Sequence, residues 1–210
     1  MSTHTPAQSA TAPDLTLHEL HGAALEPWLD GLGRLRISVF REYPYLYEGT
    51  LEYERDYLRT YVNAPESLVV LVTDAQNAVV GATTCIPLRD EGPEFQAPFL
   101  QQGIDLNTVC YFGESLLQSA YRGRGLGKEF FLRREAHART LGARWTAFCA
   151  VDRAADHPER PEGYRPLDTF WSAQGYTKRP GMQAVFVWKE ITEPAESPKT
   201  LTFWLKQWNP

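Results

Sequence analysis

The stretch QSAYRGRGLGKEFF, residues 118–131, restricts this chain more than any other part of its sequence. Three glycines alternate with arginine and leucine, and a run with helical periodicity follows directly. Glycine permits a tight backbone turn, and the first amide groups of a helix have no partners inside it. These amides, the helix dipole and the nearby Arg122, Arg124 and Lys128 predict a phosphate site. A solvent-exposed basic turn without a ligand is the simpler alternative.

The glycine spacing argues against the two best-known phosphate loops. A Walker loop needs glycine, four residues and then Gly-Lys-Ser/Thr, but Arg122 and Glu129 occupy the first and last of these positions. A dinucleotide fingerprint needs GxGxxG, and Gly127 comes one residue too early for it. A nucleotide-binding protein of another class is therefore disfavoured, although binding of ATP or NAD would revive that hypothesis.

The order of the predicted elements indicates an α+β fold. Predicted strands cover 15–20, 67–72, 78–88, 108–118, 144–151 and 184–191. Predicted helices cover 24–40, 51–62, 95–102, 125–141 and 166–174. Hairpin and strand–helix–strand units occur together in this order. It therefore favours one sheet with at least one parallel crossover over a doubly wound fold.

The length of 210 residues fits one globular domain with tails. We expect the small, polar segment 1–14 to be a disordered tail and residues 15–192 to form the domain. In the segment 193–210, Ser197 is a plausible helix N-cap and Pro198 a plausible first helical residue. We therefore predict a C-terminal helical extension that packs on the domain.

Composition excludes several classes of protein. A net charge of -5 argues against general nucleic-acid binding. No apolar run approaches the roughly 18 residues of a membrane span, and no signal peptide is evident, so we expect a cytoplasmic protein without membrane contact. The three cysteines form no CxxC pair and the five histidines show no metal-ligand spacing. Buried free thiols and the absence of a metal site are the expectations.

The glycine stretch resembles motif A of the GNAT acyltransferase superfamily, Arg/Gln-x-x-Gly-x-Gly/Ala. The run from Arg122 to Gly127 matches it throughout, behind a strand that ends at Leu116–Leu117. A second similarity is FWSAQGY, 170–176, where the family usually has an aromatic residue, three residues, Gly, and Phe or Tyr. The resemblance covers about residues 15–192. It implies a mixed, mostly antiparallel central sheet flanked by helices, in which the strand at 108–118 splays from the strand at 144–151 and the pair holds acyl-CoA.

The resemblance also implies how acetyl-CoA, the expected co-substrate, would bind. The pantetheine arm would pair with the backbone of Leu116 and Leu117 between the splayed strands. The pyrophosphate would bind the amides of the turn: Arg122, Gly123, Arg124, Gly125, Leu126, Gly127 and Lys128.

Acyl transfer to an amine needs a base for the ammonium proton and an acid for the leaving thiolate. We predict Glu114 as the base, directly or through water, because a charged residue is unusual inside YFGESLL. An ion-paired or outward-facing carboxylate is the alternative, and Asp152 is the second candidate base. The family commonly has a tyrosine acid where this chain has Trp171. Tyr164 is therefore the substitute candidate, unless the thiolate leaves without an acid.

The expected function is therefore transfer of an acetyl group from acetyl-CoA to an amine of a small molecule or peptide, by direct attack in a ternary complex. A catalytically inactive acyl-CoA sensor of the same fold is the alternative. Relatives often form homodimers, which leaves a homodimer open.

We expect the acceptor to bind between segment 43–61 and loop 153–165. Two sets of side chains there are candidates for holding it. An aromatic, mildly acidic wall would suit a cationic amine, although its tyrosines could equally serve only to pack a surface helix. Three arginines could instead bind an acceptor carboxylate. The wall is Tyr43, Tyr45, Tyr47 and Glu48, and the arginines are Arg153, Arg160 and Arg165.

Overall fold

The computed structural model describes residues 14–208, and its centre is one eight-stranded sheet. The strand order is β1-β2-β3-β4-β6-β8-β7, and β5 pairs with β3 beyond the end of β4. The strands are β1 Thr16–Leu20, β2 Leu68–Thr73, β3 Val79–Pro87, β4 Val109–Tyr111, β5 Ser115–Leu117, β6 Trp145–Val151, β7 Thr177–Trp188 and β8 Ser197–Gln207. In this part of the chain β4 and β6 form the one parallel pair, and the other strand pairs are antiparallel. The predicted α+β class with a mixed, mostly antiparallel sheet is confirmed.

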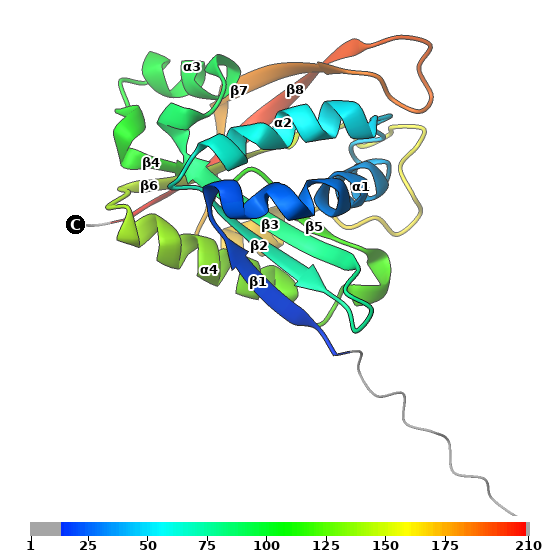
Figure 1. Cartoon of the computed structure of the whole chain (residues 1–210). Helices are drawn as coiled ribbons and strands as arrows, with labels where there is room; N and C mark the ends of the chain where they lie inside the picture. The colour runs from blue at the N-terminus through cyan, green and yellow to red at the C-terminus, as the bar shows by residue number, and fades with distance from the viewer. Residues whose placement is uncertain (1–13, 209–210) are drawn as a thin grey trace, which may run out of the picture.

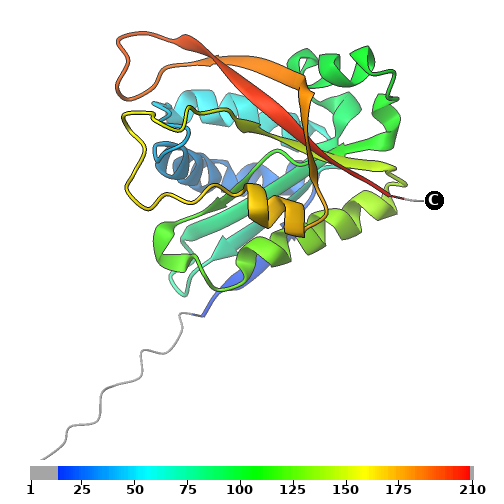
Figure 2. The same ribbon diagram turned by 180° about the vertical axis from the view of Figure 1, so that it is seen from behind.

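Helices cover both faces of the sheet. The α-helices are α1 Leu29–Phe40, α2 Leu51–Asn63, α3 Pro93–Gln101, α4 Leu126–Thr140 and α5 Asp168–Ala173. A seven-residue 3-10 helix, Gly22–Trp28, precedes α1, and single 3-10 turns lie at Leu88–Asp90, Leu106–Thr108 and Ser119–Tyr121. Helices α1 and α2 lie on one face (Figure 1), and α4 and α5 lie on the other (Figure 2). Each face therefore has its own hydrophobic layer, one under α1–α3 and one under α4 and α5.

The C-terminal segment corrects one prediction. Residues 197–207 form β8, which lies inside the sheet between β6 and β7, and not a helical extension. Leu201, Phe203 and Leu205 pack on the α1–α3 side, while Trp204 packs on the α4 side. Because a strand buried on both faces needs apolar residues on both, its sequence loses the period-two alternation that identifies most strands.

The predicted strand at 108–118 is two short strands separated by a β-bulge. Tyr111 of β4 lies opposite Ile86 of β3, but Leu116 of β5 lies opposite Ala82, which is a slip of one residue in register. The extra residue falls within 112–114 and reverses which face each later side chain points to. Tyr111 and Leu116 consequently share the hydrophobic layer under α1–α3, although strict alternation would separate them.

The predicted N-terminal tail, apart from Asp14, lies outside the described residues. Between Asp14 and Trp208, no helix has the length and apolar character needed to span a bilayer.

Candidate functional site

The bulge separates two strands that start out paired. The β4–β6 ladder runs to Tyr111 opposite Ala147, and the Phe112 amide still donates to the Ala147 carbonyl at 2.7 Å. Beyond this point β5 pairs with β3 and leaves β6. A cavity of about 630 Å³, here called the main cavity, opens between the diverging strands, the start of α4 and the loop 152–168.

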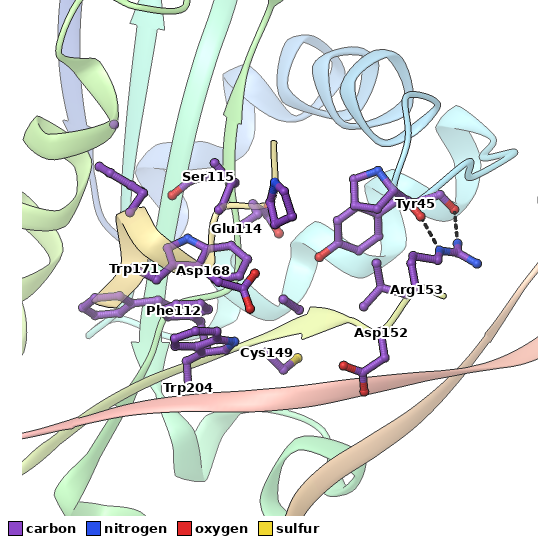
Figure 3. Close-up of a pocket in the computed structure, with 18 of the residues that line it drawn as sticks. Tyr45, Phe112, Glu114, Ser115, Cys149, Asp152, Arg153, Asp168, Trp171 and Trp204 are labelled. Atoms are coloured by element: carbon purple, nitrogen blue, oxygen red, sulfur yellow. Dashed lines mark hydrogen bonds between the residues drawn. The ribbon is translucent and has the colours of Figure 1, made fainter. Parts of the chain in front are cut away.

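Aromatic and polar residues occupy different parts of the main cavity. Phe112, Trp171 and Trp204 gather on one side, and Tyr45 and Arg153 lie on the opposite side (Figure 3). Glu114 and Ser115 lie between these two groups (Figure 3). The apolar side suits a flexible organic chain, and the carboxylate of Glu114 lies where the two sides meet.

The predicted phosphate turn lies at the same end of the molecule, directly before α4. Gly123 and Gly125 have φ angles of +77° and +84°, in the left-handed region that favours glycine, and Gly125 is the N-cap of α4. Apart from the glycine itself and its neighbours along the chain, no heavy atom of the described residues lies within 4 Å of the position that a Cβ would take at either glycine. The surface at the start of α4 is therefore open at these two glycines, as an anion site at a helix N-terminus requires.

The basic side chains of the turn have different partners. Arg122 donates through Nε to the Leu117 carbonyl at 2.9 Å and through Nη2 to Glu42 at 2.7 Å. Arg124 donates to the Ala120 carbonyl at 3.1 Å. Within residues 14–208 neither Arg124 nor Lys128 forms an ion pair, so both exposed side chains can take an anion. Arg122 instead ties the turn to the end of β5.

The backbone of β5 presents one edge to the main cavity. The Glu114 carbonyl accepts from Thr84 and the Gln118 amide donates to Val80, so even-numbered residues bond to β3. Backbone groups alternate along a strand, and those of Ser115 and Leu117 therefore point away from β3. Ser115 and Leu117 also line the main cavity, whereas Leu116 is buried in the layer under α1–α3. The geometry favours Ser115 and Leu117 over Leu116 for contact with a ligand.

Glu114 is buried and belongs to a three-residue charge cluster. The guanidinium of Arg36, on α1, pairs through Nε with Glu54 of α2 and through Nη1 with Oε2 of Glu114. Burial opposes the charge of Arg36, but the two carboxylates outweigh it and raise the pKa of the guanidinium above its ordinary value. Two carboxylates against one guanidinium leave a formal charge of -1. The second oxygen of each carboxylate, Oε1, is buried without a hydrogen-bond partner among the described residues.

Asp152 occupies a different environment at the end of β6. Its Oδ2 accepts from Thr202 at 2.6 Å, and its Oδ1 lies 3.5 Å from Lys178 Nζ. Its carboxylate points toward β8 and away from Glu114 (Figure 3). Asp152 lines the main cavity, but its oxygens already have donors, which makes it a weaker candidate base than Glu114.

Tyr164, the candidate acid, lines the main cavity from the loop after β6. Its ring stands edge-on to that of Tyr43, with centroids 4.7 Å apart, and Arg160 lies 5.1 Å from its ring centre. Burial, followed by the charge of Tyr43, raises its pKa above the ordinary value. The hydroxyl of Tyr43 is buried with no partner in the described chain. Trp171 packs against Phe148 and Trp204 and forms part of the aromatic side.

Cys149 also lines the main cavity, and its environment keeps it protonated. Burial raises the pKa of its thiol to about 12, and it lies 3.2 Å from the Tyr111 hydroxyl. A thiol with this pKa is a poor nucleophile at neutral pH. Cys85 and Cys110 are buried free thiols, as predicted. Nowhere in residues 14–208 do three or more His, Cys, Asp or Glu residues cluster in a way that could hold a metal ion.

The predicted acceptor wall divides between two places. Tyr43 meets the loop 153–165, where it packs on Tyr164 and His157, but Tyr47 faces α2 and β7. Glu48 is exposed and pairs with Lys189. Arg153 is not available for an acceptor carboxylate. It donates to the carbonyls of residues 44 and 45 and, at 2.6 Å, to Glu190.

The sequence prediction missed Arg36 and Glu54. A signal for both was present, because each stands at a core position of an amphipathic helix. Leu32, Arg36 and Phe40 follow one another at four-residue spacing on α1, and Glu54 and Leu58 do so on α2. A charged residue at such a position is expected to have a buried partner.

The mixed α+β fold, with a mostly antiparallel sheet flanked by helices, is that of the GNAT acetyltransferases, as solved structures show. An acetyltransferase of the GNAT family from Staphylococcus aureus Mu50 aligns with a TM-score of 0.56 at 10% identity, over 91% of this chain and 99% of that one. The ribosomal-protein-alanine N-acetyltransferase from Brucella melitensis aligns with a TM-score of 0.57 at 14% identity, over 91% and 99%.

A proposed acetyltransferase from Salmonella typhimurium, yncA, was solved with its cofactor acetyl-CoA. It aligns with a TM-score of 0.55 at 11% identity, over 93% of this chain and 94% of that one. No protein-family model matches the sequence, and no curated protein is significantly similar to it. At these identities the structural match establishes the fold, and the function has to be argued from the site.

Proposed function

We propose that this protein is an acyl-CoA-dependent N-acetyltransferase. The observation that carries the proposal is the continuity of the site. Free backbone amides at 123–127, the open edge of β5 and the main cavity follow one another and lead to Glu114. Phosphates, an extended amide-containing arm and a thioester would need these three surfaces in the same order. The yncA structure, which contains acetyl-CoA, supports the same ligand.

The residues of this chain have distinct tasks in this proposal. The amides of the turn and the exposed side chains of Arg124 and Lys128 bind the pyrophosphate, and Arg122 holds the turn against β5. The backbone of Ser115 and Leu117 pairs with the pantetheine arm. The bound thioester supplies the acetyl group. The aromatic side formed by Phe112, Trp171 and Trp204 excludes water from it.

Glu114 is the proposed base. Its Oε1 has no donor within the described residues, so it can accept a proton from the ammonium group of the acceptor. Arg36 holds Oε2 and thereby fixes the orientation of the carboxylate. Tyr164 remains the proposed acid for the leaving thiolate. Tyr43, whose buried hydroxyl lacks a partner in the described chain, is a second candidate beside it.

An inactive acyl-CoA sensor would need the cofactor surfaces but not an unpaired buried carboxylate oxygen. The position of Glu114 therefore favours the enzyme. The protonated thiol of Cys149 favours direct transfer over an acyl-cysteine. Turnover of acetyl-CoA with an amine separates the two functions, since a sensor binds acetyl-CoA without consuming it.

The first test is calorimetric titration with acetyl-CoA, and the chain offers a matched control. Gly125 and Gly142 both have left-handed φ angles, +84° and +69°, and open surroundings, but they lie at opposite ends of α4. Gly125→Glu puts a carboxylate where the phosphates would bind. Gly142→Glu puts the same side chain at another left-handed position, after the end of α4, so the strain on the backbone is similar but the phosphate site is untouched. We expect micromolar binding that is lost only in Gly125→Glu. No binding to the unmodified protein, or equal losses in both variants, would refute the phosphate site.

A further inference from the structure

A second cavity adjoins the main cavity on the other side of Glu114. Its volume is about 180 Å³, and it lies among α1, α2, α3 and β7. We call it the aromatic chamber, because nine of its fifteen lining residues are aromatic. Gly113, Glu114, Tyr45 and Cys149 line both cavities, so the two cavities adjoin at Glu114.

The walls of the aromatic chamber are built from packed rings. Phe95 of α3 lies 4.6 Å from Phe186 of β7 and 4.8 Å from Tyr111 of β4, measured between ring centroids. The mouth is apolar as well, since Tyr53 and Val187 line it and are 57% and 59% exposed. A cavity of about 150 Å³ with apolar walls is known to hold benzene, so this volume fits one ring with a short side chain.

The charge of the residues that line the aromatic chamber determines which ligand charge it favours. Its charged lining residues are Arg36 and Glu114, and Glu54 lies directly behind Arg36. This cluster has a formal charge of -1, and Glu114 Oε1 is a buried acceptor without a donor in the described chain. An ammonium group would neutralise the cluster and satisfy this oxygen. A neutral or anionic ligand would leave both uncompensated.

The lining of the aromatic chamber contains one cation, Arg36, and it is already paired with carboxylates, so the chamber offers no free cation for a second, anionic group on the ligand. Arg36 uses Nε and Nη1 for the two carboxylates, and its guanidinium carbon lies over the rings of Tyr57 at 4.2 Å and Phe40 at 5.1 Å. Arg153, which is close by, is held by Glu190 and by backbone carbonyls. An acceptor carboxylate would therefore enter an acidic, apolar space without a partner.

We propose that the acceptor is a primary amine carried on one aromatic ring, or on an apolar group of similar size, and that it binds in the aromatic chamber with its ammonium at Glu114 Oε1. This inference rests on the proposed acetyltransferase function. The ammonium gives one proton to Glu114, the amine nitrogen bonds to the acetyl carbon, the carbon–sulfur bond breaks, and the second proton lost by the nitrogen is balanced by protonation of the leaving thiolate. The products are the N-acetylated amine and coenzyme A thiol, with the proton on Glu114 released to solvent afterwards.

The test compares 2-phenylethylamine with phenylalanine, which has the same ring and amine and an added carboxylate. Initial rates are measured with the full chain at saturating acetyl-CoA, together with 1,4-diaminobutane as a polar amine. We expect kcat/KM for 2-phenylethylamine to exceed that for either of the others by about 100-fold or more. Equal or reversed rates would overturn the proposal. Binding of acetyl-CoA is measured separately, so a protein that does not bind it would refute the proposed function instead.

Two variants of β7 identify the binding surface. Phe186 lines the aromatic chamber, while Val185 next to it is 55% exposed and does not. We expect Phe186→Ala to raise KM for 2-phenylethylamine about tenfold with a smaller change in kcat, and Val185→Ala to change neither. An unchanged KM in a folded Phe186→Ala protein would exclude the chamber as the acceptor site. A third outcome is that the protein turns over long-chain acyl-CoA and accepts polar amines but no aromatic ones. The chamber would then hold the acyl chain, which also overturns the proposal.

Discussion

Replacing Glu114 by glutamine can show whether this carboxylate serves catalysis or only folding. The matched control is Glu54→Gln, because Glu54 and Glu114 pair with the same arginine, Arg36. Glu114→Gln and Glu54→Gln each remove one carboxylate from Arg36 and leave the other in place. Breaking a buried ion pair usually costs about 3–5 kcal/mol, since it leaves a charge without a partner. Here Arg36 keeps one partner and the cluster passes from -1 to neutral. We therefore expect each variant to lose less than about 2 kcal/mol of unfolding free energy.

Their activities should differ far more than their stabilities. Glu114 faces both cavities, whereas Glu54 is fully buried behind Arg36 and lines neither. Loss of a general base typically lowers kcat by about 10²- to 10⁴-fold, and we expect Glu114→Gln to fall in this range. The kcat of Glu54→Gln should fall about tenfold at most, because Arg36 would then hold the carboxylate of Glu114 less firmly. The assay is thiol release from acetyl-CoA with an amine acceptor, alongside urea unfolding and acetyl-CoA titration. Equal activity losses in the two variants, or an unchanged kcat/KM in Glu114→Gln, would refute the assignment of the base.

Three further predictions concern residues around this site. Burial raises the pKa of Glu91 to about 7, so the folded protein binds more protons than the unfolded chain between about pH 4.5 and 7. Its contribution to stability is then lost as pH rises through this window, by up to about 3 kcal/mol. Urea unfolding at pH 5 and pH 8 should show this loss in the unmodified protein and not in Glu91→Gln, and identical pH dependence would contradict it. Gly113→Ala should destabilise the fold by about 2–3 kcal/mol, because the added Cβ would lie 2.6 Å from Thr84 Oγ1 and closer still to Tyr61 Oη. Tyr61→Phe should recover part of this loss in a double-mutant cycle, and strict additivity would show that the two residues do not collide. Cys149→Ala should keep most of its turnover, and complete inactivation in a folded protein would revive an acyl-cysteine mechanism.

The fold class and the glycine turn before α4 could be predicted from sequence because both depend on local patterns. The glycines at 123 and 125 sit in left-handed conformations before a helix, and the turn chemistry alone indicates this. The C-terminal strand could not be predicted in the same way. Ser197 and Pro198 are acceptable at the start of a helix, and only pairing with β6 and β7 decides for a strand.

The candidate site shows the same division between local and long-range information. Glu114 stood out because a carboxylate inside an apolar run is unusual, but the sequence could not indicate which face it points to. The bulge at 112–114 decides this, and it depends on how β3 fits against two short strands at once. Arg36 pairs with residues 18 and 78 positions further along the chain. A single sequence does not show which residues so far apart in the chain come together in the fold.

The interior position of β8 has a consequence for how the chain is made. Strand β6 pairs with β4 on one edge and with β8 on the other, and β8 begins 46 residues after β6 ends. During synthesis, the backbone groups along one edge of β6 therefore stay unpaired until residues 197–207 have left the ribosome. Such an edge readily pairs with other chains. Slower growth or rapid chaperone binding should raise the yield of folded protein, and a stop codon before residue 197 should give aggregates and no smaller active enzyme.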